Sequence, residues 1–104
     1  MSKLDQNKTP LFTVLKDEYV RRNILPFHVP GHKRGKGVDK EFFNFMGEAP
    51  FSIDVTIFKM VDGLHHPKSC IKEAQELLAD AYGVKHSFFA VNGTSGAIQA
   101  MIMS

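Results

Sequence analysis

The stretch at residues 86–103 reads HSFFAVNGTSGAIQAMIM and contains the clearest structural signal in the chain. His86–Val91 is a short apolar run enriched in aromatic residues, which predicts a buried strand. Asn92–Gly96 has the small and polar residues of a tight turn. Ala97–Met103 is apolar on nearly all sides, which is typical of a helix enclosed by a larger body. The sequence therefore predicts a strand, a turn and a helix in this order.

The turn at residues 92–96 has the properties of a phosphate-binding cup. The first turn of a helix offers unpaired N–H groups and a partial positive charge, which together suit a phosphate. Glycines let the backbone approach a ligand closely, and the hydroxyls of Thr94 and Ser95 add donors. An ordinary strand-to-helix turn in which Ser or Thr caps the helix has the same residues. Both interpretations stay open on these residues alone.

A helix is predicted immediately before this unit. Ser69 is a candidate N-cap, the helix extends through Tyr82, and Gly83 suits the position after its end. Its apolar stripe comprises Ile71, Ala74, Leu78 and Ala81, widened by Leu77.

Helices and a loop are predicted in the first half of the chain. Thr9-Pro10 reads as a helix start, and Pro26 ends that element. The segment 26–37, PFHVPGHKRGKG, has too many prolines and glycines for a regular helix or a central strand. Asp39 caps a short helix that Gly47 stops.

An extended segment is predicted next, because residues 51–58 alternate apolar and polar side chains. Asp62-Gly63 turns the chain. Both Asp54 and Asp62 are candidates for a functional role, although structural roles are the expectation for each.

The glycine-rich and basic loop invites two further readings that we reject. The spacing of glycines in residues 31–37 is one residue short of a Walker-type loop, Gly37 stands where Ser or Thr should hold magnesium, and no apolar strand precedes it. Lys33, Arg34 and Lys36 are too few for a nucleic-acid patch.

Histidines and the cysteine do not predict a metal site. His28 and His32 are four residues apart, but Pro30 and Gly31 between them exclude the helix that would align the two rings. One cysteine, Cys70, excludes an internal disulfide framework and suggests a buried thiol in a reducing compartment.

Composition narrows the class of protein. The chain has 104 residues, of which 43% are hydrophobic and 23% charged, which are values of a globular protein and not of a disordered one. The net charge of +2 is too small to predict a nucleic-acid partner. The polar start has no secretory signal, and no apolar stretch is long enough to cross a membrane. We expect a cytoplasmic protein without nucleic-acid or membrane partners.

The layout also predicts a piece of a larger domain. A single strand cannot satisfy its backbone groups without neighbours. The last helix stops at Ser104 without a glycine cap or a polar stop. We therefore expect the isolated chain to fold poorly.

Taken in order, several segments resemble the beginning of the pyridoxal-phosphate-dependent ornithine/lysine/arginine decarboxylases of bacteria. The resemblance runs from about Thr9 to Ser104. One departure is at Val61–His65, where the family usually carries two acidic residues before Leu-His. The segments that carry the resemblance are TPLFTVLKDEY, PFHVPGHKRG, SIDVT, DGLHHPKSCIKEAQELLADAYG and SFFAVNGTSGAIQAMIMS.

The resemblance implies an α/β fold, namely the N-terminal fragment of a fold-type-I, aminotransferase-like large domain. It divides the chain into a disordered N-terminus at 1–8, an N-terminal segment at 9–68 and the start of the cofactor-binding large domain at 69–104. The family's enzymes are homodimers or higher assemblies with sites at subunit interfaces.

The resemblance also implies the cofactor and its contacts. Thr94, Ser95 and the backbone near Gly96 would hold the phosphate of pyridoxal 5′-phosphate. A second set, His28, His32 and His65, would line the active site or the dimer contact.

Decarboxylation of a basic amino acid, with arginine as first choice, is the implied activity. The Schiff-base lysine of the family follows a Ser-x-His pattern that this chain lacks, and Lys33 lies in the wrong context. We therefore expect the chain alone to be inactive and to contain no catalytic residue. Two alternatives stay open: a non-catalytic chain that associates with a full-length decarboxylase, or another fold-type-I enzyme such as an aminotransferase.

Overall fold

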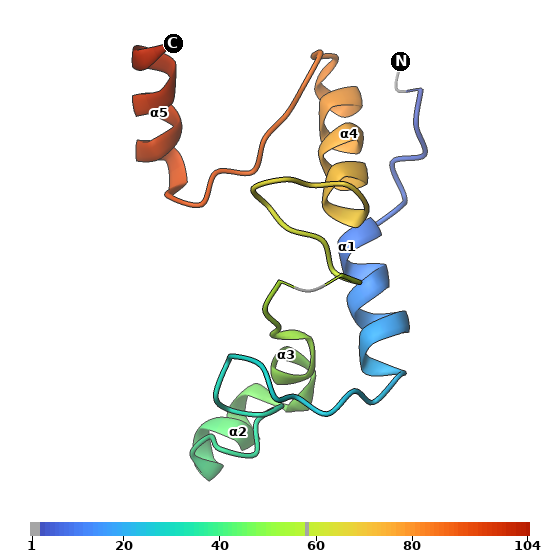
Figure 1. Ribbon diagram of the computed structural model, residues 1–104, viewed down its shortest axis with the longest axis vertical. Helices are drawn as coiled ribbons and strands as arrows, with labels where there is room; N and C mark the ends of the chain where they lie inside the picture. Colours follow the sequence, from blue (N-terminus) through green and yellow to red (C-terminus); the bar gives the residue numbers. More distant parts are fainter. Residues whose placement is uncertain (1–2, 58) are drawn as a thin grey trace.

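The computed structural model describes residues 3–57 and 59–104, and every regular element in these ranges is a helix (Figure 1). The elements are α1 (Pro10–Thr13), the π-helix η1 (Val14–Val20), α2 (Lys40–Met46), α3 (Glu48–Ile53), α4 (Cys70–Tyr82) and α5 (Gly93–Met103).

The first predicted helix is confirmed. Pro10 occupies the start of α1, where its missing N–H group costs nothing. Thr9 precedes the helix but does not cap it, since its hydroxyl lies 3.2 Å from the hydroxyl of Thr13 instead. α1 continues directly into η1, which ends at Val20, well before Pro26.

The short helix after the loop is also confirmed, whereas the extended segment after it is partly wrong. The carboxylate of Asp39 accepts the N–H of Phe42 at 3.0 Å, and Gly47 ends α2 with φ 76°. Residues 51–53, predicted as extended, belong to α3. The helical turn lets the Phe51 ring stack on the ring of Phe43 at 5.4 Å, a tertiary contact that outweighs the alternating pattern. Phe58 lies outside the described residues.

Helix α4 has the predicted bounds but a different cap and a shifted buried face. Ser69 makes no side-chain cap, and the carboxylate of Asp62 accepts the N–H groups at its start instead. Gly83 ends the helix with φ 65°, as expected. The buried residues are Cys70, Ile71, Gln75 and Ala79, so the stripe at Ala74, Leu78 and Ala81 is displaced by one position.

The predicted strand at His86–Val91 is wrong for this chain, because these residues form an extended connection without strand pairing. The described residues therefore do not display the predicted α/β architecture. A strand needs a neighbour that accepts and donates backbone hydrogen bonds, and no other described segment runs beside this one (Figure 1).

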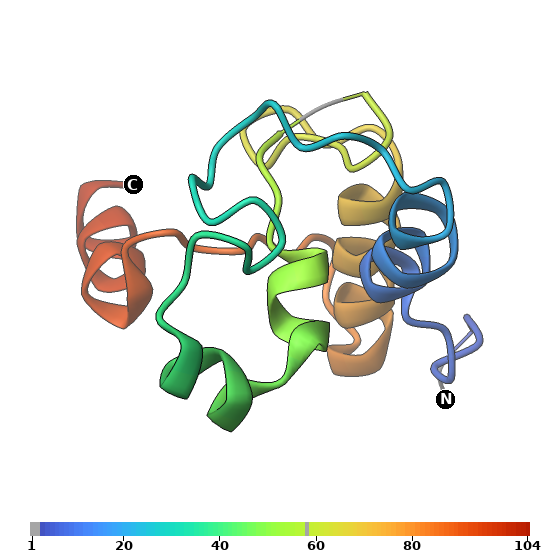
Figure 2. The same cartoon turned by 90° about the horizontal axis from the view of Figure 1, so that it is seen from below.

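The core is small and lies where the first helix meets α3 and α4 (Figure 2). Its buried apolar residues are Tyr19, Phe51, Val61, Cys70, Ile71 and Ala79. The radius of gyration is 16.5 Å, against about 13 Å for a compact domain of this length. Much of the difference comes from α5, which stands away from the other helices at the end of the extended connection (Figures 1 and 2).

The N-terminal segment 3–8 has no regular secondary structure, yet hydrogen bonds fix it to the end of α4. The backbone N–H groups of Lys3 and Leu4 donate to the carboxylate of Asp80 at 2.9 Å. Of the eight residues predicted to be disordered, Met1 and Ser2 lie outside the described residues. None of the helices in the described ranges is long and apolar enough to cross a membrane.

Candidate functional site

The residues predicted as a turn form the beginning of α5. Gly93, Thr94 and Ser95 are its first three residues, and Asn92 precedes them as the N-cap residue. The helix thus starts earlier than the predicted Ala97, because the small residues Gly93–Gly96 adopt the helical conformation themselves. Thr94 and Ser95 consequently lie at the N-terminal end of the helix, where backbone N–H groups have no acceptor within the helix.

The start of α5 suits an anion. It has no side-chain cap and no acidic residue in its first turn. Within the described part of the chain, the exposed hydroxyls of Thr94 and Ser95 have no hydrogen-bond partner. Uncapped N–H groups, free hydroxyls and the positive end of the helix dipole are the donors that a phosphate needs.

Gly96 is required by a close approach within this turn. A Cβ atom added at Gly96 would lie 2.9 Å from the Cβ of Asn92, closer than such atoms approach in proteins. Beside it, residues 88–92 and Gly96, Ala97 and Ala100 line an open groove of about 450 Å³. The predicted phosphate residues therefore stand at the edge of a groove with space for a ligand.

His28 is held by Tyr19 in the loop after the first helix. The Tyr19 hydroxyl lies 3.0 Å from Nε2 of His28, and Nδ1 lies 2.6 Å from the carbonyl oxygen of Val29. Lys33 Nζ donates to the carbonyl oxygen of His28 at 2.6 Å. These bonds fix the ring and tie the lysine to the loop.

His32 forms a histidine–carboxylate pair with Asp54. Its Nδ1 accepts the backbone N–H of Gly35 at 3.1 Å, so the ring proton resides on Nε2, which lies 3.2 Å from Asp54 Oδ2. The ring also packs edge-on against Phe51. A partner twenty-two residues away leaves no signal in the sequence, although Asp54 itself was a candidate there.

His65 lies exposed in the turn before α4, next to a carboxylate with a structural task. Burial tends to raise the pKa of Asp62, but hydrogen bonds from the backbone N–H groups of Ser69, Lys68, Gly63 and Ile71 outweigh it and lower the pKa to about 2. Asp62 thus stays ionised and serves the start of α4, as its predicted structural role requires.

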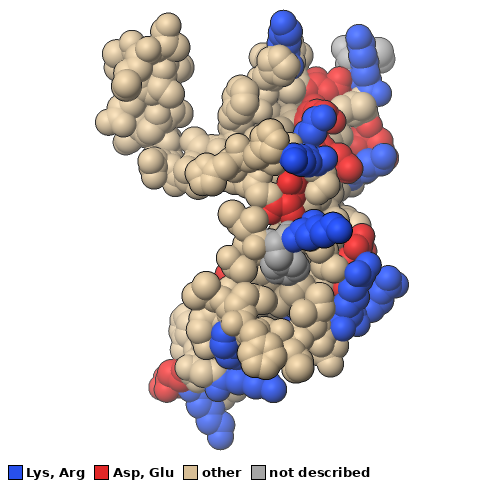
Figure 3. Space-filling view, viewed as in Figure 1, with Lys and Arg blue, Asp and Glu red and all other residues tan. Residues whose placement is uncertain are grey.

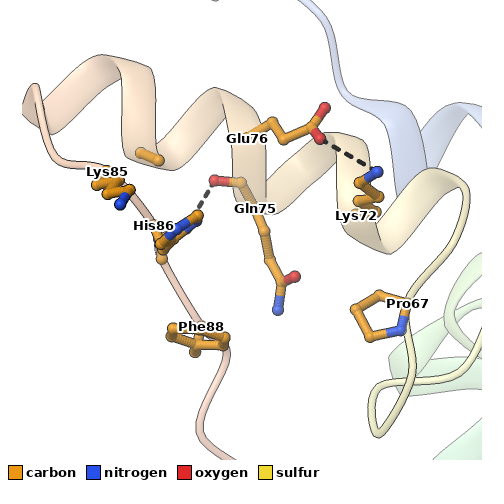
Figure 4. A pocket seen from close by; sticks show the side chains of 9 residues that line it. Pro67, Lys72, Gln75, Glu76, Lys85, His86 and Phe88 are labelled. Atoms are coloured by element: carbon orange, nitrogen blue, oxygen red, sulfur yellow. Dashed lines mark hydrogen bonds and ion pairs between the residues drawn. The ribbon is translucent and has the colours of Figure 1, made fainter.

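A second small cavity, of about 220 Å³, lies between α4 and residues 85–88 (Figure 4). Lys72 pairs with Glu76 at 3.7 Å at its rim, and the Ser87 hydroxyl donates to the carbonyl oxygen of Gln75 at 2.6 Å. Its polar groups bond to one another, so this cavity offers few free donors or acceptors.

The predicted site residues do not form one constellation in this chain. Thr94, Ser95 and Gly96 start α5, whereas His28 and His32 lie in the 26–37 loop, and the two views show that loop apart from α5 (Figures 1 and 2). In the described ranges, no three His, Cys, Asp or Glu side chains are grouped as a metal would need. Burial raises the pKa of the Cys70 thiol, whose Sγ donates to the carbonyl oxygen of Val61.

Comparison with known proteins gives a consistent match. The family model "Orn/Lys/Arg decarboxylase, major domain" matches residues 9–104. The chain is 52% identical to an arginine decarboxylase of Bacillus anthracis over 104 residues, which are 100% of this chain and 21% of that protein. It is 50% identical to an arginine decarboxylase of Bacillus cereus over 101 residues, 97% of this chain and 22% of that protein.

A more distant relative is the constitutive ornithine decarboxylase of Escherichia coli, with 32% identity over 100 residues, 89% of this chain and 14% of that protein. The chain therefore spans about a fifth of the length of the arginine decarboxylases that it matches, and corresponds to their N-terminal part. No solved structure matches it.

Proposed function

The chain belongs to the Orn/Lys/Arg decarboxylase major-domain family, and from this premise we propose that it forms the N-terminal part of a decarboxylase acting on a basic amino acid. Arginine is the proposed substrate, which the identity of about half of the residues with two arginine decarboxylases supports. The observation that carries the proposal is the family match over residues 9–104, which includes the uncapped start of α5.

An α/β, fold-type-I large domain is part of this proposal. Within it, His86–Val91 would be a strand of a sheet completed by further polypeptide, and residues 69–104 would open the cofactor-binding domain. The exposure of Phe88 and Val91 supports this, because apolar side chains of a sheet strand need covering layers. We also propose a homo-oligomer and a cytoplasmic location, the latter supported by the unpaired thiol of Cys70.

Members of the family use pyridoxal 5′-phosphate, which draws electrons from the substrate's reacting carbon when carbon dioxide leaves. In this chain, Thr94 and Ser95 would donate their hydroxyls to the phosphate, and the first N–H groups of α5 would add to them. Gly96 would keep the turn tight. His28, His32 and His65 would line the active site or a subunit contact. Lys33 is not proposed as the attachment lysine, since its Nζ is engaged by the carbonyl oxygen of His28.

A chimera tests the proposal. Residues 1–104 replace the matching segment of the Bacillus anthracis arginine decarboxylase, and release of carbon dioxide is measured with arginine, lysine and ornithine. We expect activity with arginine above that with the other two. Replacing Thr94 and Ser95 together by alanine should weaken cofactor retention about tenfold or more, since each lost bond was made to a charged group.

Ser104→Ala is the matched control, because its hydroxyl donates to the carbonyl oxygen of Met101 at the opposite end of α5. A chimera that assembles like its parent but releases no carbon dioxide from any of the three amino acids would contradict the proposed function. Unchanged cofactor retention in the double variant would contradict the proposed role of the turn.

A second candidate function is supported by α5, none of whose residues is buried. Such an apolar surface suits association with a full-length decarboxylase without a catalytic contribution. Mixing the chain with the Bacillus anthracis enzyme distinguishes the two: altered assembly or activity supports the association, and unchanged assembly and activity exclude it.

A further inference from the structure

Arg34 is fixed within the loop by two neighbours. Its Nη1 donates to the side-chain oxygen of Asn23 at 2.8 Å, and its guanidinium carbon lies 5.2 Å from the centre of the Tyr19 ring. Tyr19 itself is 1% exposed, so the surface on which the guanidinium rests does not move freely. The hydrogen bond and the ring together set the plane of the guanidinium group.

The opposite edge of the same guanidinium has no partner. Nε and Nη2 are both shut off from solvent, and neither has a hydrogen-bond partner among the residues that the structure describes. These two nitrogens form the side-on fork of arginine, whose parallel N–H groups match the two oxygens of one carboxylate. A buried charged group without a partner is costly, because it has lost water and gained nothing in exchange.

The surroundings favour an organic anion. Residues 23–27 and the side chains of Lys33, Arg34, Lys36 and Glu48 line a cavity of about 500 Å³. Three of these four side chains are cationic, and Figure 3 shows Lys and Arg side chains gathered at this lower end of the molecule. The other wall is apolar and open, with Leu25 72% and Phe27 90% exposed. Cations beside exposed apolar side chains suit a carboxylate attached to an apolar group.

The wall formed by residues 25–27 has no regular secondary structure, and its apolar side chains make few contacts. A shift of this wall would open the fork without disturbing Asn23 or Tyr19. Three of the four non-glycine residues with positive φ, namely Asn23, Lys33 and Arg34, lie at this place. Backbone strain of this kind is characteristic of ligand clamps.

We propose that Nε and Nη2 of Arg34 bind a carboxylate carried by an apolar group, in the cavity between residues 23–27 and Lys33–Lys36. The carboxylate arrives either on a small organic acid or on an acidic side chain of a second polypeptide. The site is separate from α5, so it stands or falls independently of the proposed cofactor role.

The test is an NMR titration of the ¹⁵N-labelled 104-residue chain with 3-phenylpropionate. The chain has three arginines, so the Arg34 Nε–H signal is assigned from its loss in Arg34→Lys. We expect a saturable downfield shift of this signal with the acid and none with the neutral 3-phenylpropanamide. Arg22→Lys is the control and should leave the response intact, because Arg22 is exposed and pairs with Glu18.

A second arm identifies the source of the carboxylate. The same shift on raising the chain's concentration without added acid would assign it to another copy. No saturable shift in either arm, or an equal response to the amide, would overturn the proposal. If the signals of the free chain are not dispersed, circular dichroism at 222 nm follows the same titration. Helix signal must then rise with the acid and not with the amide, and an unchanged signal counts against the site.

Discussion

Asp62 organises the start of α4 as a single residue. Its carboxylate accepts backbone N–H groups from Gly63, Lys68, Ser69 and Ile71. Replacing it by alanine leaves these donors without their acceptor, and we expect a loss of about 2 kcal/mol, the upper range for a helix cap. Urea titration followed by circular dichroism measures it. Asp17→Ala is the control, since this exposed residue only approaches Lys16 at 3.9 Å and should change little.

The pH dependence of this contribution has a definite sign. The pKa of Asp62 is lowered from 3.8 to about 2 in the folded chain, so ionised Asp62 stabilises the fold. The stabilisation is complete above pH 4 and disappears as the pH falls from about 4 to about 2. Titration of the Asp62 carboxyl ¹³C signal checks this, and a midpoint near 3.8 would contradict the capping role.

Gly35 shows a requirement of a different kind. It is buried with φ 87°, and a Cβ atom there would overlap the ring of Phe43, which is itself stacked on Phe51. We expect Gly35→Ala to destabilise the chain by about 2–4 kcal/mol, from backbone strain and overpacking together. Gly31→Ala is the matched control, because nothing lies within 4 Å of the added atom. Equal urea midpoints for the two variants would disprove this account.

At the scale of elements, α4 and α5 differ in what supports them. α4 buries four residues and has both a carboxylate at its start and a left-handed glycine at its end. α5 buries none and has only 11 residues, and an isolated helix of this length is marginal in water. Figure 3 shows its surface, at the upper left, without a single charged side chain.

Hydrogen exchange of the backbone amides tests this difference. We expect the central amides of α4, around Gln75 and Ala79, to exchange at least tenfold more slowly than those of α5, around Ala100. Both helices are observed in one sample, so α4 is the internal control. Equal protection of the two helices would show that α5 has support that the described contacts do not reveal.

The whole molecule has little to make it cooperative. Six apolar residues form the buried core, while Phe27, Phe45, Phe88 and Met103 are each more than 80% exposed. With so little apolar surface removed from water, the conformational entropy of the chain is barely offset. We expect the isolated chain to lose helix gradually on heating, measured by circular dichroism at 222 nm. A sharp, cooperative transition would contradict this expectation.

The sequence by itself determined the features that depend on neighbours along the chain. The helix after Pro10, the capping of α2 by Asp39, the stop at Gly83 and the bounds of α4 all follow from local hydrogen bonding and backbone sterics. The family, too, was readable from the order of its motifs. Local rules of this kind need no knowledge of what lies across the molecule.

Only the tertiary structure decided the features that depend on distant partners. Residues 51–53 became helical because Phe51 meets Phe43, and residues 86–91 formed no strand because no described neighbour pairs with them. The Asp62 cap, the His32–Asp54 pair and the unpaired edge of Arg34 likewise join groups far apart in the sequence. Hydrogen bonds and ring contacts are satisfied in space, so a pattern along the chain cannot specify which distant group will supply them.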